Sequence, residues 1–341
     1  MPRYKGGQLE LTEKGSLPGV SIIIPVFNGA NFLGEAIASA LAQTYPHIEI
    51  IVINDGSNDG GKTESLARSF GEAIRYFYIP NGGIARALNF GIAAMQGELF
   101  SWLSHDDIYT PQKIEKAVAA FMASDGQSIV YSNFFVMDKH GVKLYSHKLP
   151  RISDYRMRCF LMESNALHGC TLLIPRNYLQ IEGGFDESLK TTQDYDFWFR
   201  LASKYPFCHV DEELVGVRFH SGQTTTAQRK LVKEEQDQLY FHLLSSINSV
   251  EVSIYTNGCE QGFYLNLYRR FRASGFENSA ELVKQKIFSS TSDNLLLMRF
   301  TWVAVAGVSL TRVRIFMRQL LFGNDTSLYS KVILKIVRLI F

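Results

Sequence analysis

The chain of 341 residues contains 46% apolar and 20% charged residues, a composition that excludes intrinsic disorder and supplies enough apolar side chains for a sizeable core. Its 26 glycines and nine prolines are too few for a collagen-like or low-complexity protein. The formal net charge of +2 gives no electrostatic argument for nucleic acid as the main partner, and the length favours two domains.

Strands and helices are expected to alternate after an N-terminal arm over residues 1–19. The residues from Val20 to Phe27 are nearly all apolar, as in a strand buried on both faces, and Pro25 marks the place where ladder pairing should stop. Further strands are expected at 48–53, 75–79 and 99–103, and helices at 31–43, 84–95 and 112–123. This order is typical of an α/β protein with a mostly parallel central sheet flanked by helices.

The pattern changes after the helix that ends at residue 123. The elements predicted there are strands at 129–137, 171–175 and 213–219, a helix that begins near Asp194, and helix throughout beyond residue 226. We therefore expect an α/β domain over residues 20–226 and an α-helical C-terminal region over residues 227–341.

Polar and aromatic side chains follow three of the predicted strands. Phe27 follows the first strand, Asp55 the second, and Asp106 and Asp107 a third. The carboxyl ends of parallel strands meet at one edge of a sheet, where open α/β sheets bind ligands. Asp55 can accept a hydrogen bond from a nucleobase N–H, Phe27 can stack on the base, and the other two carboxylates suit Mg²⁺ or Mn²⁺ bridging a diphosphate. Each acid taken alone could instead cap a turn.

Residues 56–63 offer an alternative, because they fit the phosphate-binding loop G-x-x-x-x-G-K-[ST] and follow a predicted strand. The protein would then be an NTPase with Lys62 at the phosphates. Against this, Asp55 and Asp59 would place two carboxylates beside backbone N–H groups that must bind a polyanion. A nicotinamide site is not indicated, since no G-x-G-x-x-G follows the first strand.

Six segments occur in a fixed order between residues 20 and 226. They are VSIIIPVFN, QTYPHIEIIVINDGSNDG, NGGIARALNFGI, GELFSWLSHDD, GGFDESLKTTQDYDFWFRL and VRFHSGQTT. Together they resemble the family 2 glycosyltransferases of the GT-A fold. The resemblance implies inverting transfer of a sugar from a nucleotide donor, UDP-linked, to an acceptor hydroxyl. It also implies a divalent cation, Mn²⁺ or Mg²⁺, and synthesis of surface polysaccharide or glycolipid on a glycan or lipid-linked acceptor.

The resemblance also implies roles for single residues. Phe27 and Asp55 would contact the nucleoside, and Asp106 would bind the metal as the second acid of the family's D-x-D. His220 would be a later metal or diphosphate contact, although a histidine at a strand end is often structural. Ser104 stands where the family has its first acid, so Ser104 or Asp107 would contact the ribose. The donor-binding residues expected in this way are Pro25, Phe27, Asn28, Asp55, Arg86, Asn89, Ser104 and Asp107.

An inverting transfer is a single displacement, which needs a carboxylate to take the proton of the acceptor hydroxyl and an electrophile to stabilise the leaving diphosphate. By the resemblance Asp194 is the base, and Gln193 replaces the glutamate that the family has before it. Asp194 also suits a helix N-cap. Trp198, one turn further, is either a core residue or a platform that binds the acceptor. The substitutions at Ser104 and Gln193 leave a non-catalytic nucleotide-sugar-binding module as an alternative.

Residues 295–341 form a basic apolar tail, with seven basic residues and one acidic residue. Its uncharged run at 300–310 is shorter than the roughly 20 residues that a bilayer span needs. Residues 328–341 place apolar and basic side chains on different faces of a helix, which favours an anionic membrane surface. A helical cap on the α/β domain and an oligomer interface are the alternatives, and the oligomeric state stays open.

The four cysteines show neither a C-x-x-C pair nor metal-ligand spacing, so no disulfide is expected. The first residues of the chain are polar and lack the apolar segment of a secretory signal. We therefore expect a cytoplasmic protein, peripheral on the cytoplasmic face of the membrane.

Overall fold

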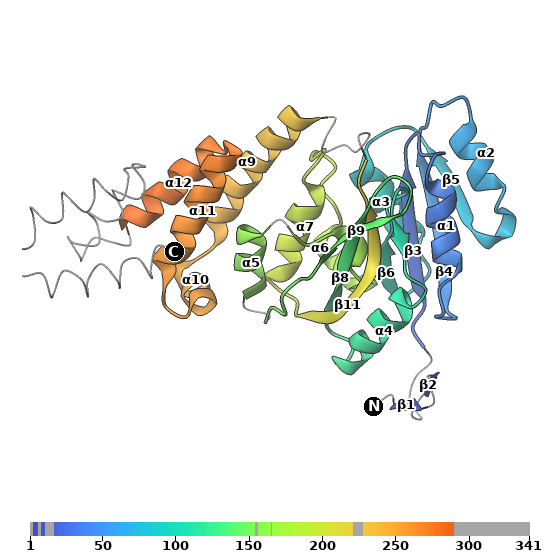
Figure 1. Ribbon diagram of the computed structural model, residues 1–341, viewed down its shortest axis with the longest axis horizontal. Helices are drawn as coiled ribbons and strands as arrows, with labels where there is room; N and C mark the ends of the chain where they lie inside the picture. The colour runs from blue at the N-terminus through green and yellow to red at the C-terminus, as the bar shows by residue number, and fades with distance from the viewer. Residues whose placement is uncertain are drawn as a thin grey trace, which may run out of the picture. The chain divides into compact units, whose positions relative to one another are not determined.

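The computed structural model describes residues 3–5, 8–10, 17–153, 156–164, 166–220 and 228–289 (Figure 1). The chain divides into two compact units, residues 1–235 and 236–341. Their boundary lies inside helix α9 (Arg229–Ser246), nine residues beyond the expected end of the α/β domain at residue 226. The basic apolar tail lies outside the described residues, so its amphipathic helix stays a prediction.

The first unit is built on a five-stranded sheet in the order β10-β6-β3-β4-β5. Its parallel strands are β3 (Val20–Val26), β4 (Ile48–Asp55), β5 (Arg75–Ile79) and β6 (Leu99–Trp102). The short β10 (Ile174–Pro175) pairs antiparallel with β6 at one edge. The expected α/β fold with a mostly parallel sheet is therefore confirmed.

Strand β3 lies at the centre of this sheet and is buried on both faces, as its apolar run predicts. Its even-numbered side chains belong to the same core cluster as the buried side chains of α1 (Leu33–Leu41). Ile23 instead packs against Gly91 of α3 (Ile84–Ala94), where a Cβ would lie 2.5 Å from its side chain. Figure 1 shows α1 and α2 (Lys62–Arg68) beside these strands.

A second, four-stranded sheet has the order β7-β11-β8-β9, which the expectation of one central sheet did not include. Its strands are β7 (Ile108–Tyr109), β8 (Ile129–Met137), β9 (Lys143–His147) and β11 (Phe207–Arg218). Only β8 and β11 are parallel to each other, and α4 (Lys113–Ala123) packs on both. The first unit also contains α5 (Met157–Glu163), α6 (Arg176–Glu182), α7 (Gln193–Ala202) and the first residues of α9.

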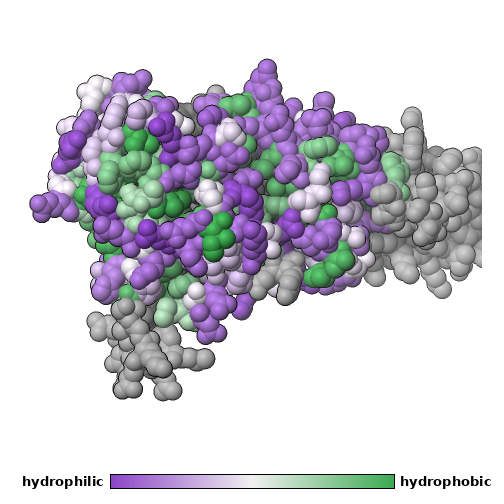
Figure 2. Space-filling view, turned by 180° about the vertical axis from the view of Figure 1, so that it is seen from behind, coloured by the Kyte–Doolittle hydropathy of each residue, from purple (hydrophilic) through white to green (hydrophobic). Residues whose placement is uncertain are grey.

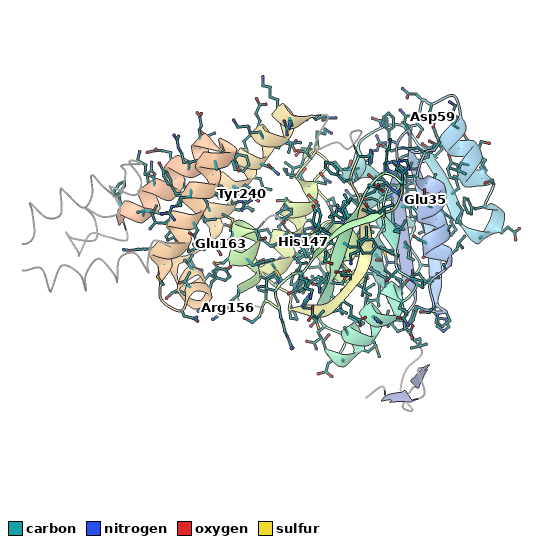
Figure 3. All side chains as sticks on the ribbon, in the orientation of Figure 1. Glu35, Asp59, His147, Arg156, Glu163 and Tyr240 are labelled. Atoms are coloured by element: carbon teal, nitrogen blue, oxygen red, sulfur yellow. The ribbon has the colours of Figure 1, made fainter. Side chains whose placement is uncertain are left out.

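Most of the described residues of the second unit are helical. They form the end of α9, α10 (Ser249–Thr256), α11 (Glu260–Ser274) and α12 (Glu277–Ser289). Tyr240, labelled in Figure 3, packs against the rings of Phe271 and Phe276. Asp237 accepts hydrogen bonds from the backbone N–H groups of Asn278 and Ser279 at the start of α12.

Two further expectations concern the N-terminal arm and the cysteines. The N-terminal arm contains a small antiparallel pair, β1 (Arg3–Lys5) and β2 (Gln8–Glu10), which we did not expect. The four cysteines all lie in the described part of the chain and form no disulfide, as predicted.

Among the described helices, none combines the length and the apolar content needed to cross a membrane. Figure 2 shows, on the face turned away in Figure 1, apolar side chains in separate patches among polar ones. Scattered patches of this kind are ordinary on protein surfaces and do not mark a binding face by themselves.

Candidate active site

Three parallel strands of the first sheet end at the same edge. β3 and β4 pair in register, with Val26 opposite Asn54, so the residues that follow them emerge side by side. β6 pairs with the other side of β3 and leads into residues 104–107. The strand pairing therefore brings the predicted residues Phe27, Asp55 and Asp106 to neighbouring strand ends, as expected.

Asp55 is 3% exposed and organises the loop before α3. Its Oδ1 accepts a hydrogen bond from the N–H of Gly82 at 2.8 Å, and its Oδ2 accepts one from Gly83 at 2.8 Å. The side-chain amide of Asn81 donates to Oδ2 at 3.2 Å. Oδ1 keeps a second acceptor position to which a nucleobase N–H can donate. The nucleoside contact of Asp55 stays a prediction.

Pro25, Phe27 and Asn28 lie at the end of β3. Pro25 is buried, and pairing with β4 continues to Val26, one residue beyond the expected end, while pairing with β6 stops at residue 23. Phe27 is 45% exposed, so its ring is accessible to a base. The Asn28 amide exchanges two hydrogen bonds of 2.8 Å with Asn58 and joins this loop to the next.

The loop 56–63 holds a carboxylate where a P-loop would hold phosphate. The Oδ2 of Asp59, labelled in Figure 3, accepts hydrogen bonds from the hydroxyl of Thr63 at 2.6 Å and from its N–H at 3.0 Å. These bonds hold the pKa of Asp59 below its ordinary value. An anion therefore already occupies the N-terminus of α2 and opposes a second one. The NTPase interpretation is not supported by this geometry.

Asp106 and His220 meet although 114 positions separate them in the chain. The Oδ2 of Asp106 and the Nε2 of His220 are 3.0 Å apart, and the side chains are 15% and 16% exposed. The Phe32 ring lies 5.0 Å from the imidazole. A solvent-reached pair of one carboxylate and one imidazole fits the ligands of a divalent cation such as Mn²⁺. The structure brings the two predicted ligands together, and the metal stays a prediction.

Arg218, the last residue of β11, is completely buried and holds this turn in place. Its Nε donates to the backbone oxygen of Asp106 at 2.8 Å, and its Nη2 donates to Glu35, labelled in Figure 3, at 2.7 Å. The guanidinium lies 4.5 Å from the ring centroid of Phe32. Its backbone N–H donates to Oδ1 of Asp107 at 2.9 Å. The sequence alone did not predict a role for Arg218, although this residue lies in VRFHSGQTT, one of the six segments that carry the resemblance.

Asp107, His168 and Cys170 form a cluster whose ligand-type atoms lie within 4.8 Å of one another. The Cys170 thiol donates to Oδ2 of Asp107 at 3.4 Å, and His168 Nε2 is 3.8 Å from the same oxygen. Desolvation by burial raises the pKa values of Asp107 and Cys170 and lowers the pKa of His168 to about 4. All three shifts favour the neutral form, so the cluster is best described as an uncharged hydrogen-bonded network.

This network gives Asp107 a structural role that the sequence did not predict. Its side chain is 2% exposed and both of its oxygens accept hydrogen bonds inside the protein. These bonds favour a structural role for Asp107, and its ribose contact stays a prediction. Ser104 is partly exposed and remains a candidate for the ribose contact. His168 and Cys170 were missed, because no spacing in the sequence connects them with Asp107.

Asp194 lies in the first turn of α7, whose N-cap is Thr192 rather than Asp194 itself. Its Oδ1 accepts a hydrogen bond from the N–H of Tyr195 at 2.9 Å. Burial raises the pKa of Asp194 to about 6, a value that suits a general base near neutral pH. The neighbouring Gln193 is 4% exposed, and its side-chain oxygen has no hydrogen-bond partner among the described residues.

The remaining three predicted site residues have different outcomes. Trp198 is 0% exposed and packs against Phe185, so it is a core residue, and the expected acceptor platform is wrong because no face of the indole is accessible. The Asn89 amide donates to the backbone oxygen of Phe185 at 2.8 Å and accepts from its N–H at 2.9 Å, which fixes that loop. Arg86 is exposed and packs over Gly82, and its diphosphate contact stays a prediction.

A buried lysine connects the first sheet with the second. Lys113 of α4 is 0% exposed, and its Nζ donates to the Ser101 hydroxyl and to the backbone oxygen of Leu172. The Nζ lies 4.4 Å from the ring centroid of Tyr109. No acidic partner pairs with it in the described part of the chain. Burial lowers the pKa of Lys113 to about 7.

We expect Lys113 to make the fold more stable as the pH rises above 7. In the unfolded chain the lysine keeps its proton up to its ordinary pKa of 10.5, whereas the folded chain has lost it. In this window the residue should add about 1.4 kcal/mol to the free energy of unfolding per pH unit. Urea denaturation of the wild type and of Lys113→Met at pH 7 and pH 9 measures this slope. Parallel pH dependence of the two proteins would contradict it.

Residues 21–180 match the model of the family described as Glycosyl transferase family 2. An uncharacterized glycosyltransferase of Rickettsia typhi is 46% identical over 273 residues, which cover 78% of this chain and 83% of that protein. This chain is a family 2 glycosyltransferase. The resemblance stated from the six segments is thereby confirmed.

Two other proteins with similar sequences are longer than this chain. An uncharacterized glycosyltransferase of Rickettsia conorii is 51% identical over 210 residues, 60% of this chain and 34% of that protein. The chondroitin synthase of Pasteurella multocida is 26% identical over 242 residues, 70% of this chain and 24% of that protein. The chain thus spans about a third or less of the length of these two relatives.

A solved structure supports the fold. Residues 1–349 of S. aureus TarS, in complex with UDP-GlcNAc, superpose with a TM-score of 0.52 at 16% identity. The match covers 79% of this chain and 92% of that chain. At this level of identity the likeness shows the shared GT-A fold.

Proposed function

We propose that the protein is an inverting glycosyltransferase that moves a sugar from a UDP-linked donor to a hydroxyl of a glycan or lipid-linked acceptor, in the synthesis of surface polysaccharide or glycolipid. Family membership supports glycosyl transfer. The observation that carries the proposal is the Asp106–His220 pair at the edge where the parallel strands end. The UDP-GlcNAc bound to TarS supports a UDP donor, and the similarity to a chondroitin synthase supports a polysaccharide product.

Asp194 would act as the general base. A carboxylate with a pKa of about 6 is mostly ionised at neutral pH, yet basic enough to take a proton from an acceptor hydroxyl in the transition state. Inversion in one displacement needs no nucleophilic side chain. Burial raises the pKa of the Cys170 thiol, which therefore stays unreactive in the network with Asp107.

The donor would bind at the ends of β3, β4 and β6. Phe27 would stack on the base, and Asp55 would accept the base N–H through Oδ1. Asp106 and His220 would hold a divalent cation. Such a cation supplies electrostatic stabilisation for the charge that develops on the leaving nucleoside diphosphate. Arg218 would keep the Asp106 turn in place through its bond to the backbone oxygen.

Thermal unfolding with a panel of nucleotide sugars, each with and without Mn²⁺ or Mg²⁺, tests this function. Binding to the native state raises the melting temperature, so one class of donor should stabilise the protein, and only with the cation. The stabilising donor should then release its nucleotide when an acceptor is present. Stabilisation by nucleoside triphosphates alone would favour an NTPase, and binding without turnover would favour a non-catalytic module.

We propose further that the basic apolar tail, residues 295–341, holds the protein on the cytoplasmic face of the membrane. Its composition supports this, because an apolar face and basic residues act together at anionic lipid. Deleting the tail should abolish co-sedimentation with anionic vesicles and leave donor binding unchanged. Replacing Lys331, Lys335 and Arg338 with glutamine should weaken the co-sedimentation less than the deletion does. Unchanged vesicle binding with a lower melting temperature would show that the tail is part of the core instead.

A further inference from the structure

A carboxylate from α9 binds the chain where it enters α7. The Oε1 of Glu235 accepts a hydrogen bond from the N–H of Lys190 at 2.8 Å. Its Oε2 accepts bonds from the N–H of Thr191 at 2.8 Å and from the Thr191 hydroxyl at 2.7 Å. The hydroxyl of Thr192 donates to the same oxygen at 3.4 Å. The Glu235 carboxylate thus accepts hydrogen bonds from two backbone N–H groups and two hydroxyl groups of three consecutive residues. Glu235 and these three residues all belong to the first unit.

These bonds fix the start of the helix that carries Asp194. Thr192 is the N-cap of α7, yet its side chain makes no capping hydrogen bond to the helix and donates to Glu235 instead. The first N–H groups of a helix lack partners within it, and a carboxylate near them is favourable. Asp194 is only two residues after Thr192. A change in the direction in which the chain enters α7 therefore moves the Asp194 carboxylate.

Glu235 is suited to this contact because it stays ionised. Burial alone would raise the pKa of Glu235, but the hydrogen bonds from Thr191 and Lys190 outweigh burial and hold the pKa below its ordinary value. An ionised carboxylate accepts hydrogen bonds and donates none, so it suits a site where all four neighbouring groups are donors. The neighbouring Glu234 is exposed and pairs with Lys230 at 3.8 Å, so the two glutamates have different surroundings on the same helix.

We propose that Glu235 is a positioning residue for the transfer reaction, which holds Asp194 where it can take the proton of the acceptor hydroxyl. The proposal rests on the proposed function of Asp194 as the base. A displacement of about 1 Å can cost up to about 10²-fold in rate, so the bonds that fix this loop matter for turnover. The proposed donor-binding residues Asp55 and Asp106 lie at strand ends of the first sheet and are held by hydrogen bonds that do not involve Glu235. Donor binding therefore does not depend on Glu235.

The variant Glu235→Gln keeps the size of the side chain and one acceptor oxygen but loses the charge and the second acceptor. We expect its kcat to fall by about 10-fold, with the donor KM and calorimetric donor binding unchanged. Glu234→Gln is the matched control, since it makes the same chemical change on the exposed neighbour and should leave kcat unchanged. Thr191→Val removes only the hydroxyl bond and should lower kcat by about threefold, which keeps the test open if Glu235→Gln folds poorly.

A double-mutant cycle separates positioning from a general loss of structure. In the Asp194→Asn background, Glu235→Gln should not lower the residual turnover further, because the group that it positions has been removed. An equal further loss in that background would overturn the proposal, as would normal kcat values for both Glu235→Gln and Thr191→Val. Near-normal turnover of Asp194→Asn would instead reject the base itself, which is a different failure from that of Glu235 alone.

Discussion

Replacing Asp194 with asparagine is expected to lower turnover by about 10²-fold or more, the scale of losing a general base. Asparagine has nearly the same shape and can still accept the hydrogen bond that Tyr195 donates to Oδ1, so the start of α7 should be preserved. Nucleotide-sugar binding should survive, because it depends on residues after β3, β4 and β6. Initial rates at saturating donor and acceptor, together with calorimetric donor binding, measure the two effects separately.

The pH dependence of the same variant sharpens this test. Burial raises the pKa of Asp194 to about 6, and the base must be ionised to act, so kcat/KM of the wild type should rise as the pH increases through about 6. Asp194→Asn should lack that rise. Asp196→Asn is a matched control in the same helical turn, where the carboxylate pairs with Arg200 at 2.9 Å. Near-normal turnover in Asp194→Asn, or an equal loss in Asp196→Asn, would reject the assignment.

Those parts of the fold that depend on local pattern could be predicted from the sequence. The apolar run of β3 indicates burial on both faces whatever its partners are, and the structure has it at the centre of the sheet. The polar residues at the ends of β4 and β6 could be placed at one edge, because parallel strands have a common direction. The strand order and direction alone were therefore sufficient to place Asp55 and Asp106 at the same edge of the sheet.

The second sheet could be predicted only in part. β8 was expected with its observed bounds, 129–137, whereas β7 and β9 carry little local signal. All but the last side chain of β9 are exposed, so no alternation of apolar and polar residues marks it. β7 has two residues and depends on its pairing with β11. Register shifts at Glu213 interrupt the pairing of β11 with β8, which breaks the two-residue period. The apolar pattern is regular only after this break, and β11 was therefore expected to begin at 213 rather than at Phe207.

Much of the candidate site depends on contacts between distant positions. Arg218 and Asp107 are bonded across 111 positions, and Cys170 and Asp107 across 63. No spacing rule connects such residues, so their roles follow only from the fold. Trp198 was ambiguous for another reason. Nearly every side of α7 is buried, so the aromatic one turn after Asp194 could not be assigned to a solvent face or to the core by helical period alone.

Replacing Asp106 with alanine is expected to weaken cation-dependent binding of UDP by about 10²-fold or more, because it removes the carboxylate of the proposed metal site. Binding measured without Mn²⁺ should change little. The backbone oxygen of Asp106, which accepts the bond from Arg218, remains in the variant, so the turn should keep its shape. Calorimetric titration of UDP with and without Mn²⁺ isolates the contribution of the side chain.

Lys62→Ala is the informative comparison for that variant. Lys62 is exposed at the start of α2, where Asp59 already accepts the bonds of Thr63, and we expect its removal to leave UDP binding unchanged. His220→Ala should resemble Asp106→Ala, because the two side chains are 3.0 Å apart and would share the cation. If Lys62→Ala abolished nucleotide binding while Asp106→Ala and His220→Ala did not, the phosphates would lie at the loop 56–63. The proposed cation site would then be wrong and the NTPase interpretation would return.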